Sequence, residues 1–279
     1  MTERALWVRR ENVPLYGMMH DPGSGARGLM LVCAPLFEER KSAHRPLVEW
    51  ARAACDAGWR TLRFDYRGCG DSSGSFREAT MDDWDLDVLA AAEELRKTAP
   101  DAPLVVLGLR MGACLAARLS AVCAVDAMVF WEPVLNGHAY LMETLRKKLM
   151  KDMLTDGGAR QSRDALIEAL EAGQQIDVDG YALAPGLYHG MKQLDLLSET
   201  GAASRRALLM HVSHRAEIPE NFSRLRDALA ARGCQIKADA VKLQPFWNLV
   251  GYTSITPLMD ATLQWLKAAF SEKLLSKVL

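Results

Sequence analysis

The chain has 279 residues, 49% of them hydrophobic, so it can bury one substantial core and still carry an inserted segment. A formal net charge of −1 gives no reason to expect nucleic acid or an anionic membrane as a partner held by bulk electrostatics. The six cysteines lack CxxC or metal-ligand spacing, so we expect reduced thiols, no metal and no cofactor.

Charges interrupt every apolar run in residues 1–17, which argues against the uninterrupted core of a signal peptide. No stretch of about 18 apolar residues follows, the length that a transmembrane helix needs. We therefore expect a cytoplasmic protein without a transmembrane segment.

Short apolar runs alternate along the chain with segments of helical period, a pattern typical of a mostly parallel sheet with helices on both faces. The predicted strands are 5–8 and 15–19, which form an initial hairpin, then 29–33, 61–65, 103–107, 127–131, 207–212 and 235–243. The predicted helices are 44–57, one starting at 81, 113–121 and 257–270. This order predicts an α/β fold with about eight strands.

The composition changes between residues 138 and 200, where charged, Met-containing helical segments replace sheet strands. We expect a helical cap at 138–200, inserted into a core made of 1–137 and 201–279. Residues 139–154 form a basic amphipathic pattern, which can bind membranes but is more typical of a cap helix with one apolar face.

The motif Gly108-Leu109-Arg110-Met111-Gly112 follows a predicted strand and precedes a helix of small residues. In α/β-hydrolases this position carries G-x-S-x-G, whose glycines permit a strained turn that presents the nucleophilic serine beside backbone N–H donors. Residues 65–72 (DYRGCGDS) resemble the segment that precedes this turn in many serine hydrolases. The sequence thus predicts an α/β-hydrolase fold in which Arg110 replaces the nucleophile.

The catalytic histidine should follow the last strand, because these enzymes have the chain order nucleophile, acid, histidine. No histidine lies beyond residue 214, and Phe246 or Trp247 occupies the expected place. Near the expected acid position, Glu217 is the only carboxylate. Loss of nucleophile and base removes a factor on the order of 10⁶ from turnover in a comparable triad. A pseudoenzyme is therefore favoured.

Several segments together resemble one family, the exosortase A system-associated hydrolase 2 proteins. They are CAPLFEERKSAHR (33–45), DYRGCGDSSG (65–74), the GLRMGA turn (108–113), FWEPVLNG (130–137) and the late Phe-Trp pair. The likeness extends over most of residues 29–265, with APLF where family members have a PPF-like run. The resemblance implies an α/β-hydrolase-superfamily protein associated with exosortase, PEP-CTERM sorting and exopolysaccharide genes, whose partners are an exosortase-pathway protein or a small anionic or acyl ligand.

Arg110 would hold a permanent positive charge at the positive end of a helix dipole, which costs stability unless an anion lies close. Its companion is either an internal acid or the carboxylate or phosphate of a ligand held by the guanidinium fork. The internal candidates are Glu38, Glu39, Glu132 and Glu217, all expected at the carboxyl edge of the sheet.

Two alternatives to a ligand-binding pseudoenzyme stay open. One is an esterase, thioesterase or acyl transferase with a rebuilt site, with weak catalytic candidates in Cys33, His214 and Glu217 and further acids in Glu38 and Glu132. The other is a structural or assembly protein whose pocket is filled by side chains. Trp247 either lines a pocket or belongs to the core.

Overall fold

The computed structural model describes residues 1–10, 12–23, 25–155, 161–199 and 204–271. Its centre is an eight-stranded sheet in the order β1-β2-β4-β3-β5-β6-β9-β10. The strands are β1 (Thr2–Arg10), β2 (Val13–Asp21), β3 (Gly28–Cys33), β4 (Trp59–Phe64), β5 (Leu104–Leu109), β6 (Val125–Trp131), β9 (Ser204–Ser213) and β10 (Gln235–Lys242). Only the β1-β2 and β2-β4 pairs are antiparallel. The predicted mostly parallel α/β-hydrolase sheet is confirmed.

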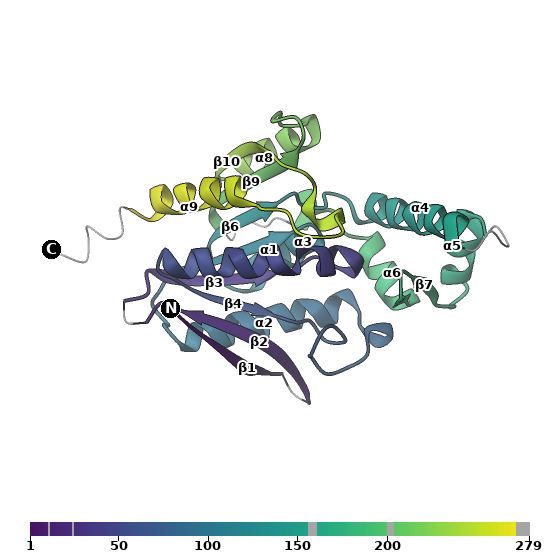
Figure 1. Ribbon diagram of the computed structural model, residues 1–279, viewed down its shortest axis with the longest axis horizontal. Coiled ribbons are helices and arrows are strands. Elements are labelled where there is room, and N and C mark those ends of the chain that lie inside the picture. The colour runs from purple at the N-terminus through teal and green to yellow at the C-terminus, as the bar shows by residue number, and fades with distance from the viewer. Residues whose placement is uncertain (11, 24, 156–160, 200–203, 272–279) are drawn as a thin grey trace.

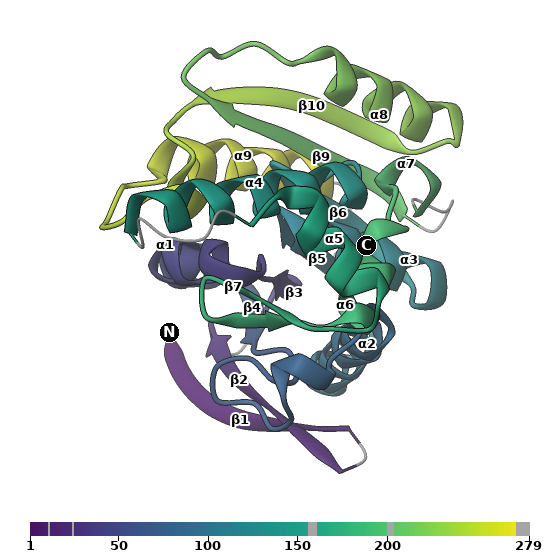
Figure 2. The same ribbon diagram turned by 90° about the vertical axis from the view of Figure 1, so that its right-hand side faces the viewer.

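Helices cover both faces of this sheet (Figures 1 and 2). Helices α1 (Phe37–Asp56) and α9 (Thr256–Phe270) pack on one face, and α2 (Met81–Lys97), α3 (Met111–Val122) and α8 (Glu220–Ala231) on the other. Every residue of the central strands β3 and β5 is buried. Burial on both faces explains why these strands appear in the sequence as continuous apolar runs.

Helix α1 begins seven residues before the predicted start at 44, since it spans Phe37–Asp56. The sequence pattern missed this first part because it is charged and because Pro46 lies inside the helix. Phe37 enters the helix with a φ of 52°, in the left-handed region. The earlier start matters for the site because it places Glu38 and Glu39 in the first helical turn.

The chain between β6 and β9 gathers at one end of the molecule (Figure 1). Its elements are α4 (Gly137–Thr155), α5 (Arg163–Glu171), β7 (Ile176–Val178), β8 (Tyr181–Leu183), α6 (Pro185–Lys192) and α7 (Leu196–Glu199). The segment is mostly helical, with a small antiparallel β7-β8 pair that the sequence did not predict. Of the predicted cap, 156–160 and 200 lie outside the described residues, as do 201–203 and 272–279 of the predicted core. The division into core and cap stays a prediction.

Within the described ranges, no helix combines the length and apolar character needed to cross a bilayer.

Candidate functional site

Arg110 lies in the sharp turn between β5 and α3, with φ 55° and ψ −121°. A positive φ is strained for a side chain other than glycine, and such strain persists only where surrounding contacts hold it. Here the Arg110 N–H donates to the Trp131 carbonyl at 3.1 Å, and the Arg110 carbonyl accepts from Val134 N–H at 3.3 Å. The backbone geometry of a nucleophile turn is therefore present with arginine at its apex.

The two glycines of the turn are required by close backbone contacts. A Cβ on Gly108 would lie 2.4 Å from the Ala113 Cα, and a Cβ on Gly112 would lie 2.2 Å from the Cys33 carbonyl oxygen. Neither neighbour is the end of a flexible side chain. The glycine pattern thus follows from packing of α3 against β5 and β3, whatever residue occupies position 110.

The guanidinium of Arg110 forms an ion pair with Glu39, whose Oε1 lies 3.2 Å from the arginine Nε. Both side chains are nearly buried, with exposures of 12% for Arg110 and 9% for Glu39. The other carboxylate oxygen of Glu39 accepts from the Tyr140 hydroxyl at 3.2 Å. Tyr140 comes from α4, so this network joins the turn, α1 and the segment between β6 and β9. Of the four acids considered from the sequence, Glu39 is the one paired with Arg110.

Burial and charge act against each other in this pair. Burial raises the pKa of Glu39 above its ordinary value, although the positive charges of Arg110 and Lys147 oppose the change. Burial alone would lower the pKa of Arg110, but the nearby Glu39, Tyr140 and Glu132 outweigh it and raise that pKa. Arg110 therefore stays cationic inside the protein.

Trp247 completes the surroundings of Arg110. It follows β10 in a short 3₁₀ turn (Phe246–Asn248) and is buried. Its ring centroid lies 5.3 Å from the guanidinium carbon of Arg110, and the Tyr140 ring lies at 5.7 Å. These distances fit cation–π contacts. The segment after the last strand thus returns to the turn, but it carries an indole, which donates a hydrogen bond and cannot accept a proton.

A histidine–carboxylate pair that the sequence analysis missed lies at the same sheet edge. Glu132 directly follows β6 and has a φ of 42°, and its Oε2 lies 2.9 Å from the Nδ1 of His211 on β9. The same oxygen accepts from the Val212 N–H at 2.7 Å. Burial raises the pKa of Glu132, while the Val212 N–H and His211 oppose the change. A signal for the pair existed, because both residues lie near the carboxyl ends of predicted strands.

Glu132→Ala should lower the free energy of unfolding by about 1–3 kcal/mol, because the buried Val212 N–H loses its acceptor. Glu132→Gln should cost less, since its carbonyl oxygen can still accept from that N–H. Urea denaturation of the two variants measures the difference. An alanine variant as stable as the unaltered chain would contradict a structural role for this carboxylate.

The remaining sequence candidates lie apart from this network. Glu38 is 43% exposed and pairs with Lys41. Cys33 is fully buried, and burial raises the pKa of its thiol to about 12, which suppresses the thiolate. His214 and Glu217 are exposed in the loop after β9, and no hydrogen bond or ion pair joins them in the described part of that loop.

Met111 is buried at the first position of α3, directly after Arg110. It lies in the turn, where an α/β-hydrolase has the residue next to its nucleophile. Its assignment to a ligand site, like those of Arg110, Glu38, Glu39, Glu132 and Trp247, stays a prediction.

The mostly parallel eight-stranded sheet and the strained turn before α3 define an α/β-hydrolase. The chain belongs to the family described as serine aminopeptidase, S33, whose model matches residues 29–190. The match includes the turn at Arg110 and ends before Trp247. No curated protein matches the sequence.

Solved esterase and lipase structures share the fold. Est1E from Butyrivibrio proteoclasticus, with ferulic acid bound, has 15% identity and a TM-score of 0.69 over 96% of this chain and 100% of its own. The Pyrococcus furiosus esterase Pf2001 has 17% identity and a TM-score of 0.64, covering 97% of this chain and 91% of its own. A monoglyceride lipase variant from Saccharomyces cerevisiae has 14% identity and a TM-score of 0.64, covering 96% of each chain. Likeness at these identities establishes the fold alone.

Proposed function

We propose that this protein is a member of its family without serine-hydrolase activity, and that it acts by binding a partner in the exosortase, PEP-CTERM and exopolysaccharide system. The observation that carries the proposal is the buried Arg110–Glu39 ion pair at the apex of the nucleophile turn. The resemblance of residues 29–265 to the exosortase A system-associated hydrolase 2 proteins supports the link to that system. A cytoplasmic location belongs to the same proposal.

The chemistry of the turn supports the absence of hydrolysis. A guanidinium remains protonated in proteins and offers no lone pair for attack on a carbonyl. Trp247, which contacts Arg110, cannot serve as a general base. Glu39 adds a carboxylate beside the turn, where acyl transfer requires donors that stabilise a developing negative charge. Each of the three side chains opposes the serine mechanism in a different way.

The side chains packed around Arg110 affect which kind of partner the protein can bind there. Glu39 already neutralises the guanidinium, while Tyr140 and Trp247 pack beside it. An anionic ligand at Arg110 would have to share the guanidinium with Glu39, whose carboxylate would repel it. We therefore favour a protein of the exosortase pathway over a small ligand held at this turn.

Labelling with a fluorophosphonate probe tests the loss of the nucleophile. The unaltered chain should remain unlabelled under conditions that label a serine esterase completely, because no activated hydroxyl occupies the turn. Labelling that maps to one residue of this chain would overturn the proposal. The link to the system has its own test: deletion of the gene should impair PEP-CTERM sorting or exopolysaccharide export, and unchanged sorting and export would contradict it.

A second candidate function is hydrolysis or acyl transfer at a rebuilt site, favoured by the 2.9 Å contact between Glu132 and His211. A carboxylate that orients an imidazole is the acid–base half of many hydrolytic sites. For this candidate, thioester or ester turnover by the unaltered chain should fall by a factor of about 100 or more in His211→Phe. Turnover unaffected by that substitution would exclude the pair as the base.

A further inference from the structure

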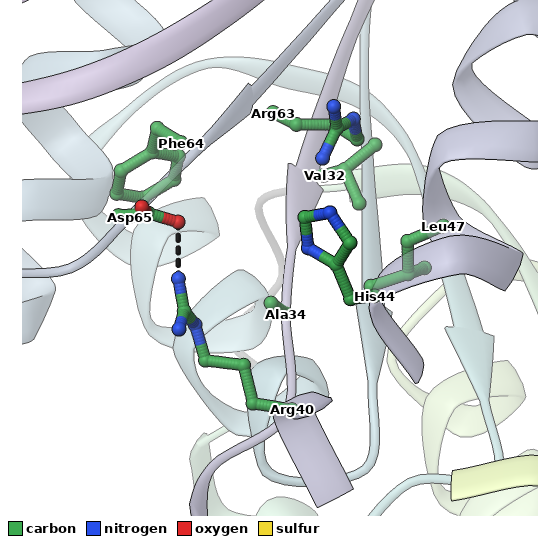
Figure 3. A pocket seen from close by; sticks show the side chains of 8 residues that line it. All are labelled: Val32, Ala34, Arg40, His44, Leu47, Arg63, Phe64 and Asp65. Carbon is green, nitrogen blue, oxygen red and sulfur yellow. Dashed lines mark hydrogen bonds and ion pairs between the residues drawn. The ribbon is translucent and has the colours of Figure 1, made fainter. Parts of the chain in front are cut away.

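A small polar pocket, apart from the Arg110 network, lies between α1 and the carboxyl end of β4 (Figure 3). It is lined by Val32, Ala34, Arg40, His44, Leu47, Arg63, Phe64 and Asp65, and its cavity volume is about 20 Å³. One water needs roughly 10–15 Å³ measured in this way. The pocket therefore has room for one or two groups of the size of a water molecule, such as oxygens of a small anion, and for little more.

Two arginines and a histidine form the basic part of the lining. The side chains of Arg40, His44 and Arg63 point into the same space, with Asp65 as the one carboxylate among them (Figure 3). Asp65 is already engaged, because one of its oxygens pairs with Arg40 and the other accepts from the Asp71 N–H at 3.0 Å. Asp65 acts on the second arginine, Arg63, through its charge and not through an ion pair.

Arg63 is the cation without a matching acid. Its Nε donates to the Nε2 of His20 at 3.3 Å. Burial, followed by the charge of Arg63, lowers the pKa of His20 to about 4, so this imidazole is neutral at pH 7. A histidine supplies no negative charge in either protonation state. In the described part of the chain no carboxylate lies within ion-pair distance of Arg63. Burial also lowers the pKa of Arg63, although the charges of Asp65 and Glu3 oppose the change, so holding this charge away from water is costly.

We propose that this pocket binds an oxyanion, the carboxylate or phosphate-type head group of a small ligand, through the guanidinium of Arg63 with Arg40 and His44 beside it. Arginine suits this role because its planar fork of N–H donors matches two oxygens of one anion. The site is separate from Arg110 and does not depend on the proposed loss of hydrolysis.

His44 gives the site a pH dependence. Burial lowers the pKa of His44, and the charges of Arg63 from β4 and Arg40 from α1 add to that effect, while Asp65 opposes it. A bound anion adds negative charge beside the imidazole and raises that pKa again. By linkage, anion affinity increases as pH falls and His44 becomes protonated.

NMR titration of the intact protein tests the site, with the backbone amides of Ala34 and Phe64 as reporters. Sodium sulfate is the probe for a tetrahedral anion, since it does not itself titrate near neutral pH, and sodium acetate is the probe for a carboxylate. Sodium chloride at equal ionic strength is the control for screening. Saturable shifts with sulfate or acetate, but not with chloride, support the proposal, and the stronger of the two identifies the ligand chemistry.

Arg63→Gln should weaken the affinity for that anion about tenfold, through loss of a charge-assisted hydrogen bond. The matched control is Arg4→Gln, which removes the same charge from an exposed position of β1 and should leave the affinity within about twofold. His44→Gln, which keeps a polar side chain at a partly solvent-exposed position of α1, should keep the fold and remove the increase in affinity at low pH. Equal shifts with all three salts, or equal loss in the Arg63 and Arg4 variants, would overturn the proposal.

Discussion

Glu39→Gln is expected to lower the free energy of unfolding by about 3–5 kcal/mol, the usual cost of removing one partner from a buried ion pair. The substitution keeps the size of the side chain but leaves the Arg110 guanidinium without a countercharge at 12% exposure. It also weakens the acceptor for the Tyr140 hydroxyl. Urea denaturation, followed by circular dichroism, measures the change.

Two further variants separate the ion pair from a general effect of substitution. Glu39→Gln combined with Arg110→Met should regain most of the lost stability, because the uncompensated charge is gone and methionine keeps apolar contact with Trp247. Glu38→Gln is the matched control, since Glu38 is 43% exposed and its pair with Lys41 contributes about 1 kcal/mol or less. A loss below about 1 kcal/mol for Glu39→Gln itself would show that the pair does not hold the turn.

Gly112→Ala should lower the free energy of unfolding about as much as Glu39→Gln does, although the substitution adds a single methyl group. The new Cβ would lie 2.2 Å from the carbonyl oxygen of Cys33 and 2.6 Å from that of Ala34. The first oxygen belongs to the last residue of β3, whose residues are all buried, and the second to the residue that follows it, so a shift of this backbone would disturb the end of the strand. We expect a loss of about 3 kcal/mol or more, at the upper end of overpacking costs, or failure to fold.

Gly186→Ala is the matched control for this prediction. Gly186 also lies in a helix, α6, and an added Cβ would meet only the Thr80 side chain at 3.4 Å. Its stability should change by no more than about 1 kcal/mol, because helix propensity favours alanine. If Gly112→Ala were tolerated equally well, α3 could not approach β3 as closely as described.

The sequence was sufficient to predict the sheet and the turn at Arg110. Buried parallel strands are recognisable as continuous apolar runs, and the glycines around Arg110 follow a strand and precede a small-residue helix. The place of the catalytic histidine, after the last strand, could likewise be found in the sequence, where Phe246 or Trp247 occupies it. The reason is that topology fixes the order of the catalytic residues along the chain in this fold. These inferences use local patterns that tertiary structure rarely alters.

The choice of partner for Arg110 could not be predicted in the same way. Glu38 and Glu39 are adjacent and chemically identical, and a rotation of about 100° around α1 decides which one is buried. That rotation depends on where α1 begins, and the charged first turn and Pro46 concealed its start. The Glu132–His211 pair depends on which strands are neighbours in the sheet. Strands β6 and β9 are adjacent there, although a long segment separates them in the sequence.

The role of Arg63 also could not be predicted, because in the sequence it looks like an ordinary polar residue of a strand. In the sequence it is a polar residue between Leu62 and Phe64, as expected for a strand with alternating faces. Only the packing of α1 beside β4 brings Arg40 and His44 to it. Residues that gather from separate elements in this way have no short motif by which they could be recognised.

We propose that Arg110, paired with Glu39, and Trp247 stand where an active α/β-hydrolase has its catalytic serine and histidine. The most direct test is the hydrolysis of p-nitrophenyl butyrate by the purified, unaltered chain, with the heat-unfolded chain as background. We expect no turnover above that background. Saturable turnover that persists in Arg110→Ala would contradict this proposal, because a working site would then exist without any contribution from the residue at the apex of the turn.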